Sequence, residues 1–369
     1  MRVLFATTRG AGHLGPLVPF ALACARAGHH VLVAGPTSAA TLAARAGLQF
    51  RAAGEVPASV VDAAFAPVWA RRATAEHVVG DLFAGLHARA ALPGMLALVE
   101  QWRPDVVARE TMEFASAVAA DRFGVPQVRI GVHLDSDVDG AGALAAVAAQ
   151  QLGLAPERLV EGPLLTRSPG AERPGVHRFR TDVPRRRNGD LIYVTFGSEA
   201  PASQHFPGVY RRAAEALAGF PVLMTIGDRR EPAALGPLPA GVRVERWVSQ
   251  AELMPRALAM VSHGGSGSTL ASLAAGVPQA FVPLFVDGPA NAERVAALGA
   301  GIVAGGDLRA AVLALLEQPA YGAAAERVAD EIAALPPVQD AIEVFARQGS
   351  QPRTGMPRRY RSAAGHAIR

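Results

Sequence analysis

Residues 262–291 read SHGGSGSTLASLAAGVPQAFVPLFVDGPAN, and this stretch decides the fold class. The apolar run over 258–261 predicts a buried strand, and the run rich in alanine and leucine over 270–275 predicts a helix that ends at Gly276. The small residues between these elements form a strand-to-helix turn. The first N–H groups of a helix lack internal partners and favour an anion. A phosphate site and an ordinary α/β turn are both open at this point.

Strand–helix units continue on the amino-terminal side of this stretch. A strand over 2–8, a helix over 16–27 and a strand over 30–34 form a β-α-β unit, which predicts a parallel sheet. A second series begins with a strand over 191–196 and includes a strand over 281–285. We therefore expect an α/β protein in which two Rossmann-like parallel-sheet domains face each other across a cleft.

Composition divides the chain between these two series. The predicted parts are a first domain over 1–165, a linker rich in Pro, Gly and Arg over 166–190, a second domain over 191–348 and a tail over 349–369. The last helix of the second domain is expected to pack back on the first. The tail contains five arginines and no acidic residue, and its Pro, Gly and Ser content predicts disorder. Subtracting these five charges from the formal +4 leaves −1, so nucleic-acid binding is not expected.

The composition also limits the chemistry. The chain has one cysteine, Cys24, so no internal disulfide forms and a cytoplasmic location is expected. Cys24 lies in an apolar helical run and is interpreted as a core residue. Every basic residue is arginine, which excludes a P-loop lysine and a Schiff-base lysine. Without a signal peptide or an uninterrupted apolar run of about 18 residues, no membrane association is expected.

A second candidate site follows the first strand. Gly10, Gly12 and Gly15 fit the dinucleotide fingerprint, but no acid follows the second strand to hold a ribose hydroxyl. His13 in the same turn lies at the carboxyl edge of the predicted sheet, where ligands bind in open α/β folds. Its imidazole titrates near neutral pH, so we interpret His13 as a catalytic base rather than a local cap.

Two glutamates are expected near His13. Glu110 and Glu113 follow a strand that ends near residue 108, so both lie at the same sheet edge. A carboxylate there can bind the imidazole and stabilise its charged form. The alternative is that Glu110 pairs with Arg109 or with a nearby helix.

Three blocks of sequence resemble bacterial family 1 glycosyltransferases, above all the actinomycete enzymes that attach sugars to natural products. The blocks are RGAGHLGPLVP at 9–19, YVTFGS at 193–198 and, within 246–295, RWVSQ, HGGSGST, AGVP, VPLFVD and NAERV. The resemblance covers about residues 1–348. It implies the GT-B fold, a nucleoside-diphosphate sugar as co-substrate and a small-molecule aglycone as acceptor.

The resemblance implies a role for each matched residue. Trp247 would stack on the nucleotide base, and the backbone of Val248 would read the base edge. Asp287 would bind the donor sugar, and His13 would be the general base with Glu110, or else Glu113, as its partner. The remaining donor-binding residues would be Gly12, Ser198, His263, Gly265, Ser266, Gly267, Ser268 and Thr269. No cofactor or metal is expected, because a helix N-terminus can stabilise the departing diphosphate.

Two positions depart from the family's pattern. Plant relatives have glutamate at the position of Ala271, where it binds ribose hydroxyls, and relatives usually have glutamine at the position of Gly288. The first change fits a deoxythymidine diphosphate donor, and the second fits a deoxysugar or altered donor use. The expected reaction is the inverting, metal-independent transfer of a (deoxy)sugar from a dTDP-linked donor to a hydrophobic aglycone.

The acceptor pocket is expected to be apolar with a few polar groups, drawn from Phe65, Trp69, Phe83, Phe114, His133 and Asp135. Residues 135–140 imitate an EF-hand loop, but Ala146 replaces the required glutamate, so calcium is not expected. Two alternative functions stay open: a non-catalytic GT-B accessory protein that activates a partner transferase, and a cell-wall type transferase. Assembly as a homodimer also stays open. The early Gly-His-Leu-Gly-Pro turn disfavours a UDP-sugar epimerase.

Overall fold

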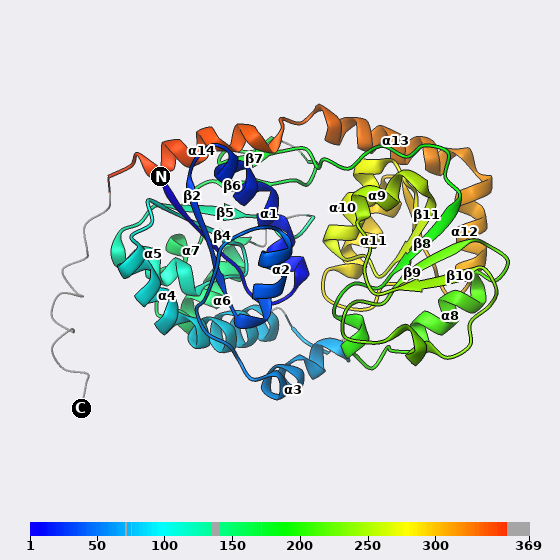
Figure 1. The fold of residues 1–369 in the computed structure, drawn as a ribbon, viewed down its shortest axis with the longest axis horizontal. Coiled ribbons are helices and arrows are strands. Elements are labelled where there is room, and N and C mark those ends of the chain that lie inside the picture. Colours follow the sequence, from blue (N-terminus) through cyan, green and yellow to red (C-terminus); the bar gives the residue numbers. More distant parts are fainter. Residues whose placement is uncertain (71, 75, 135–140, 171, 353–369) are drawn as a thin grey trace.

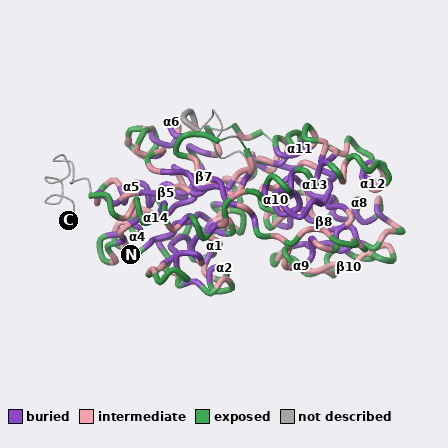
Figure 2. Tube along the Cα trace, turned by 90° about the horizontal axis from the view of Figure 1, so that it is seen from above, coloured by how far each residue is buried: buried purple, intermediate pink, exposed green. Residues whose placement is uncertain are grey.

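The computed structural model describes residues 1–352 except residues 71, 75, 135–140 and 171. Two α/β halves lie side by side, each built around a parallel sheet (Figure 1). The most buried segments are the central strands and the helix faces on them (Figure 2). The two parallel sheets confirm the predicted fold class.

The first sheet has the order β3-β2-β1-β4-β5-β6-β7. Its strands are β1 Arg2–Ala6, β2 His30–Gly35, β3 Phe50–Ala52, β4 Val106–Glu110, β5 Gln127–Ile130, β6 Leu164–Thr166 and β7 Val176–Arg178. Side chains alternate between its faces. Val3 and Phe5 face a core shared with α1 and α14, whereas Leu4 and Ala6 face a core shared with the helices α4 to α6.

The helices of this half are α1 Ala11–Arg26, α2 Ala40–Arg45, α3 Ala58–Trp69, the π-helix η2 Glu76–His87, α4 Ala88–Trp102, α5 Ala115–Phe123, α6 Ala141–Leu152 and α7 Pro156–Leu159, with the short 3-10 helix η1 Thr37–Ala39. The continuous stretch Glu76–Trp102 is long and apolar enough to cross a membrane by length and composition. Its residues Val79, Met95 and Val99 are buried in the first core.

The second sheet has the order β10-β9-β8-β11-β12-β13. Its strands are β8 Leu191–Thr195, β9 Val222–Thr225, β10 Val242–Glu245, β11 Ala257–Ser262, β12 Gln279–Phe281 and β13 Gly301–Val303. Its helices are α8 Gly208–Ala216, α9 Gln250–Leu253, α10 Ser266–Ala275, α11 Gly288–Ala297, α12 Leu308–Glu317 and α13 Pro319–Ala334, with 3-10 helices η3 Ala200–Ala202, η4 Pro232–Leu235 and η5 Met254–Arg256. The strand predicted over 281–285 was wrong, because β12 ends at Phe281. Pro283 lacks the N–H group that a ladder requires.

The chain crosses between the two halves twice. The range 166–190, expected to be a linker, contains β7, which pairs with β6 and completes the first sheet. After α13 the chain returns through η6 Val338–Asp340 to α14 Ala341–Gly349, where Phe345 packs on Phe5 at 5.8 Å between ring centres. The crossing segments lie side by side, since Arg180 N donates to the Pro336 carbonyl at 2.8 Å (Figure 1). The first domain is therefore β1–β7 with α1–α7 and α14, and the second is β8–β13 with α8–α13.

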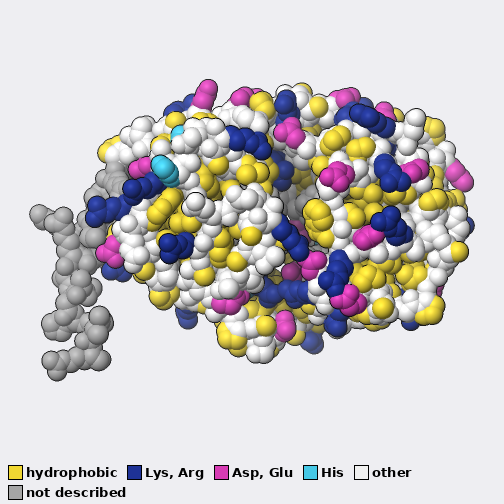
Figure 3. Space-filling view, viewed as in Figure 1, with side chains coloured by type: hydrophobic (Ala, Val, Ile, Leu, Met, Phe, Trp, Pro, Cys, Tyr) yellow, Lys and Arg dark blue, Asp and Glu magenta, His cyan; other side chains and the backbone are white. Residues whose placement is uncertain are grey.

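The surface between the two domains is hollowed, with acidic and basic side chains at its edge (Figure 3). The domains also contact each other around this cleft. Arg45 pairs with Asp228 at 2.8 Å, and the Trp69 ring packs edge-on against Phe285 at 4.8 Å. The loops that follow the strands of both sheets face this cleft.

Candidate active site

His13 lies in the first turn of α1, which starts at Ala11 rather than at the predicted residue 16. Pro16 favoured the later start because proline is common at the first helical position, but here it lies inside the helix. Gly10 precedes the helix with φ +97°, a conformation that suits glycine. The helix start thus directs His13 toward the cleft at the carboxyl edge of β1.

Glu110 is the carboxylate that binds His13. Its Oε1 lies 3.0 Å from His13 Nδ1 and accepts the Thr8 hydroxyl at 2.8 Å, while Oε2 accepts the N–H of Met112 at 2.5 Å. Glu113, the other candidate, is turned toward α5, where it accepts the Ser116 N–H at 3.1 Å. Glu113 therefore caps a helix.

The two charges stabilise each other. Burial disfavours the charged form of Glu110, but His13, the Met112 N–H and Thr8 outweigh it and lower the pKa of this carboxyl. Burial likewise lowers the pKa of His13, yet Glu110, with smaller contributions from Glu199 and Asp287, raises that pKa above 6.5. The Nδ1 side of the imidazole faces the carboxylate, which leaves Nε2 to take a proton.

Arg109 holds the loop that carries Glu110. The guanidinium is buried, and its Nη1 donates to the carbonyls of Glu110 at 3.4 Å and Glu113 at 3.0 Å. Nε donates to Gln127 Oε1 at 3.1 Å, and Nη2 donates to the Leu159 carbonyl. Arg109 thus contacts the backbone of this loop and leaves the Glu110 carboxylate to His13.

The turn before α10 has the expected form. The helix begins at Ser266 and ends at Ala275, and the φ of +72° at Gly276 fits the predicted cap. A Cβ at Gly265 would lie 2.6 Å from the His263 ring, so glycine is required there. Ser268 Oγ accepts Gln250 Nε2 at 2.8 Å, and Thr269 is buried beneath the turn. The unpaired amides of the first turn are available to an anion.

His263 lies directly under this turn. Burial lowers its pKa to about 4, against smaller opposing effects of the Asp287 charge and a hydrogen bond to the Thr195 backbone. The centre of its ring lies 5.4 Å from the centre of the Phe285 ring. The His263 Nδ1 atom has no hydrogen-bond partner among the described residues. The imidazole is therefore neutral at pH 7.

Asp287 connects the turn to the loop after β5. Its Oδ2 accepts the Ser266 hydroxyl and Asn291 Nδ2, the latter at 3.1 Å, and lies 3.7 Å from His133 Nδ1. Burial acts to raise the pKa of this carboxyl, but the interactions with His133 and Ser266 outweigh burial and lower the pKa to about 2. His133, predicted to bind the acceptor, is therefore found beside a predicted donor residue.

The other expected donor residues lie on loops or in the first turns of helices, and most of them are exposed. Trp247 follows β10 with 67% of its surface exposed, and with the half-buried Val248 it borders an open groove of about 790 Å³. Ser198 is exposed after β8, Gly12 is exposed in the first turn of α1 and Gly267 is exposed in the first turn of α10. These positions leave the Trp247 ring free to stack on a planar group.

Aromatic side chains from both domains form the rest of the cleft wall. The ring centres of Phe83 and His13 are 5.3 Å apart, and those of Phe65 and Trp69 are 5.5 Å apart. Trp69 in turn contacts Phe285, which the sequence interpretation had assigned to a strand and so had missed. His87 contacts both Phe83 and Phe65, so the rings run from His13 to the second domain.

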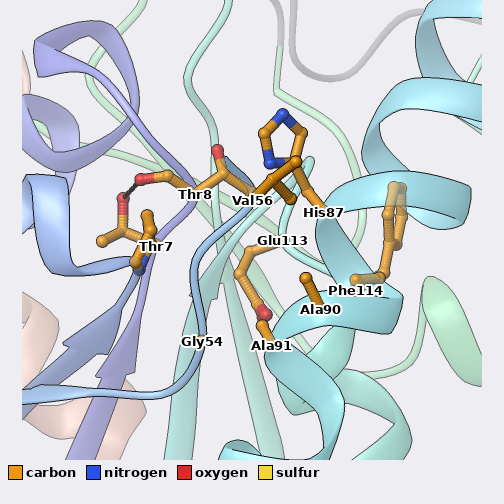
Figure 4. Close-up of a pocket in the computed structure, with 11 residues that line it drawn as sticks. Thr7, Thr8, Gly54, Val56, His87, Ala90, Ala91, Glu113 and Phe114 are labelled. Carbon is orange, nitrogen blue, oxygen red and sulfur yellow. Dashed lines mark hydrogen bonds between the residues drawn. The ribbon is translucent and has the colours of Figure 1, made fainter. Parts of the chain in front are cut away.

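Phe114, like Phe83, is buried in the first core. Phe114 lines a cavity of about 20 Å³ with Thr8, His87 and Glu113 (Figure 4). This volume holds about one water molecule. Asp135 lies outside the described residues.

Gln250, Phe285, Thr8 and Asn291 are site residues that the sequence interpretation missed. Asn291 ends the stretch that decides the fold, and its amide donates to the Gly264 carbonyl at 2.8 Å. Over the described part of the chain, no cluster of three or more His, Cys, Asp or Glu side chains could hold a metal ion. Metal independence stays a prediction.

Comparison with known proteins identifies the family whose sequence pattern the chain matches. Residues 22–168 and 216–346 match the N-terminal and C-terminal domains of the family described as erythromycin biosynthesis protein CIII-like. L-demethylnoviosyl transferase of Streptomyces niveus is 35% identical, over 82% of this chain and 84% of its own. Elloramycin glycosyltransferase of Streptomyces olivaceus is 33% identical, over 92% of this chain and 95% of its own.

Solved structures agree with this assignment. The glycosyltransferase SnogD from Streptomyces nogalater superposes with a TM-score of 0.73 at 28% identity, covering 94% of this chain and 99% of its own. SsfS6 of a Streptomyces species, complexed with thymidine diphosphate, has a TM-score of 0.73 at 25% identity with the same coverage. The chain therefore belongs to the erythromycin CIII-like family of actinomycete glycosyltransferases and is a glycosyltransferase of natural-product biosynthesis with the GT-B fold.

Proposed function

We propose that the chain transfers a sugar, with inversion and without a metal ion, from a dTDP-linked donor to a hydroxyl group of a hydrophobic aglycone. The observation that carries this proposal is the His13–Glu110 pair at 3.0 Å, on the opposite side of the cleft from the first turn of α10. The base and the anion-binding turn thus belong to different domains, as a two-substrate reaction across a cleft requires.

The proposed reaction consists of one displacement. His13 takes the proton from the acceptor hydroxyl, and the acceptor oxygen attacks the anomeric carbon from the face opposite the diphosphate. The bond between that carbon and the diphosphate oxygen breaks, and configuration inverts. Negative charge that develops on the diphosphate is stabilised by the amides at the start of α10 and by the hydroxyl of Ser268.

Two observations support a dTDP-linked donor. SsfS6 was solved as a complex with thymidine diphosphate. Ala271 in α10 is buried and has no group for a ribose hydroxyl, so nothing at this position favours a ribonucleotide over a deoxyribonucleotide. Strong preference for UDP-glucose over dTDP-sugars would contradict this part of the proposal.

The test uses the purified chain, a panel of dTDP- and UDP-sugars, and aromatic and macrolide aglycones, with products identified by mass spectrometry. His13→Ala should lower kcat/KM by about 10²–10⁴-fold, because this is the usual contribution of a general base. His30→Ala is the matched control, since His30 is exposed at the amino end of β2, whereas His13 lies at the carboxyl edge of the sheet. A His13→Ala variant as active as the wild type would rule out the assigned base.

The non-catalytic alternative predicts a different result. An accessory protein would release no nucleoside diphosphate with any donor and acceptor, and it would change the rate of a separate transferase. Acceptor-dependent release of dTDP that requires His13 supports the enzyme.

A further inference from the structure

The C-terminal end of α3 is held on the second domain. The Trp69 ring packs edge-on against Phe285 with the ring centres 4.8 Å apart, and the Trp69 carbonyl accepts Gln204 Nε2 at 3.1 Å. Val68 is buried in the hydrophobic cluster of the second domain, which also contains Leu284 and Phe285. A helix of the first domain therefore packs, at its end, into the core of the second domain.

The π-helix η2 extends this contact and also reaches the first core. Leu82 is buried in the same second-domain cluster, whereas Val79 and Phe83 are buried in the first core. His77 Nε2 lies 3.1 Å from the Ala64 carbonyl oxygen, which connects η2 to α3. We refer to α3 and η2 together as the bridge. Its helix α3 spans the cleft at the edge opposite the two crossing segments (Figure 1).

On the second domain, the ring that receives Trp69 also packs beneath the turn before α10. The ring centres of Phe285 and His263 are 5.4 Å apart. The His263 ring fills the space between Gly197 and Gly265, since a Cβ on either glycine would lie 2.7 Å or less from this ring. Densely packed interiors transmit small displacements. An anion on the turn and the ring of Trp69 therefore act on the same pair of side chains.

On the first domain, the bridge carries the rings that lie beside the proposed base. Phe83 lies 5.3 Å from His13 between ring centres, and His87 lies 5.9 Å from Phe83 and 6.4 Å from Phe65. Phe65 belongs to α3 and lies 5.5 Å from Trp69. The position of this wall beside His13 thus depends on whether the bridge is docked on the second domain.

We propose that Trp69 is a positioning residue that couples the two substrate sites, because its contact with Phe285 docks the bridge and lets a diphosphate on the α10 turn stabilise the wall beside His13. The proposal rests on the proposed function, in which the α10 turn binds the diphosphate. It gives Trp69 a role different from the acceptor contact expected from the sequence. Coupling between two sites is reciprocal. Loss of docking therefore weakens the binding of dTDP, although Trp69 belongs to the other domain.

Hydrogen exchange with and without saturating dTDP tests the coupling. In the wild type, dTDP should slow amide exchange at the start of α10 and also across α3, the latter by about 5-fold or more, the lower end of typical couplings. In Trp69→Leu, α3 should lose this dependence on dTDP while α10 keeps it. Trp69→Phe, which retains an aromatic ring, should behave as the wild type. Val60→Ala is the matched control in α3, since Val60 is 44% exposed.

The Kd for dTDP, measured by calorimetry, is the second readout. Trp69→Leu should raise this Kd by about 2- to 12-fold, the range for one aromatic pair. In a Phe285→Leu background the same change should have no effect, because the ring that Trp69 contacts is absent. A residue that served the stability of the first domain alone would leave the Kd for dTDP unchanged.

The outcomes separate this role from the proposed function. Slower exchange in α10 without slower exchange in α3 would overturn the coupling, and this wild-type comparison decides it even if Trp69→Leu does not fold. An α3 that still responds to dTDP in a folded Trp69→Leu, or an unchanged Kd, would overturn the role of Trp69. If dTDP slows exchange nowhere in the wild type, the donor site of the proposed function is overturned instead.

Discussion

At the scale of single residues, the proposed reaction predicts that the pairing of His13 with a buried carboxylate sets the pH dependence of the rate. A general base acts as the neutral imidazole, and Glu110 raises the pKa of His13 above 6.5, so kcat/KM should increase as pH rises through this raised pKa. In Glu110→Gln the charge is lost while burial, which lowers the pKa, remains. The acid limb of the profile should therefore move to lower pH, and the plateau should fall about 10-fold or more.

The measurement is kcat/KM over about pH 5 to 9, the range in which histidine titrates. Glu113→Gln is the matched control, because Glu113 caps α5 and does not contact His13. Its acid limb should coincide with that of the wild type. An acid limb that shifts equally in both variants would contradict the assignment of Glu110.

Strand placement alone predicted His13 and two nearby glutamates, and the family resemblance favoured Glu110 with Glu113 as the alternative. Both follow β4, and the choice depends on the loop that Arg109 holds through its carbonyls. Phe285 was missed for a similar reason. Its apolar neighbours predicted a strand, whereas the chain leaves the sheet at Phe281 and directs Phe285 to Trp69.

At the scale of elements, the turn before α10 and the start of α11 are in close contact through Gly264 and Gly288. Gly288→Ala places a methyl group 2.3 Å from the His263 carbonyl, so it should destabilise the fold by about 1–3 kcal/mol. Gly267→Ala lies in open space in the first turn of α10 and should stabilise by about 0.5–1 kcal/mol. Urea unfolding of both variants checks these opposite signs, and a stabilised Gly288→Ala would contradict the packing described here.

Among the elements, the strands with strong β patterns were predicted and the short ones were not. β6 and β7 have three residues each, and they lie in or beside a segment whose Pro, Gly and Arg content favours a linker. β7 forms because β6 provides a parallel ladder for it, a contact that local composition does not show. The turn chemistry around α10, in contrast, is local, and its glycine cap at Gly276 was predicted correctly.

At the scale of the whole molecule, α14 completes the core of the first domain from the far end of the chain. Phe345 is fully buried against Phe5, so Phe345→Ala should cost about 3–5 kcal/mol and lower the Tm. Arg347→Ala, on the exposed side of the same helix, should leave the Tm nearly unchanged. Thermal unfolding followed by circular dichroism measures both, and equal Tm values would contradict a structural role for α14.

The return of the chain through α14 also determines how the two domains can move. Two segments connect them, and these segments are hydrogen-bonded to each other at Arg180 and Pro336. A single connection would allow the domains to twist as well as bend, but two adjacent connections resist twisting. This arrangement favours bending about one axis along this edge over twisting. Bending along this edge would change the distance between His13 and the α10 turn while keeping the two in the same register.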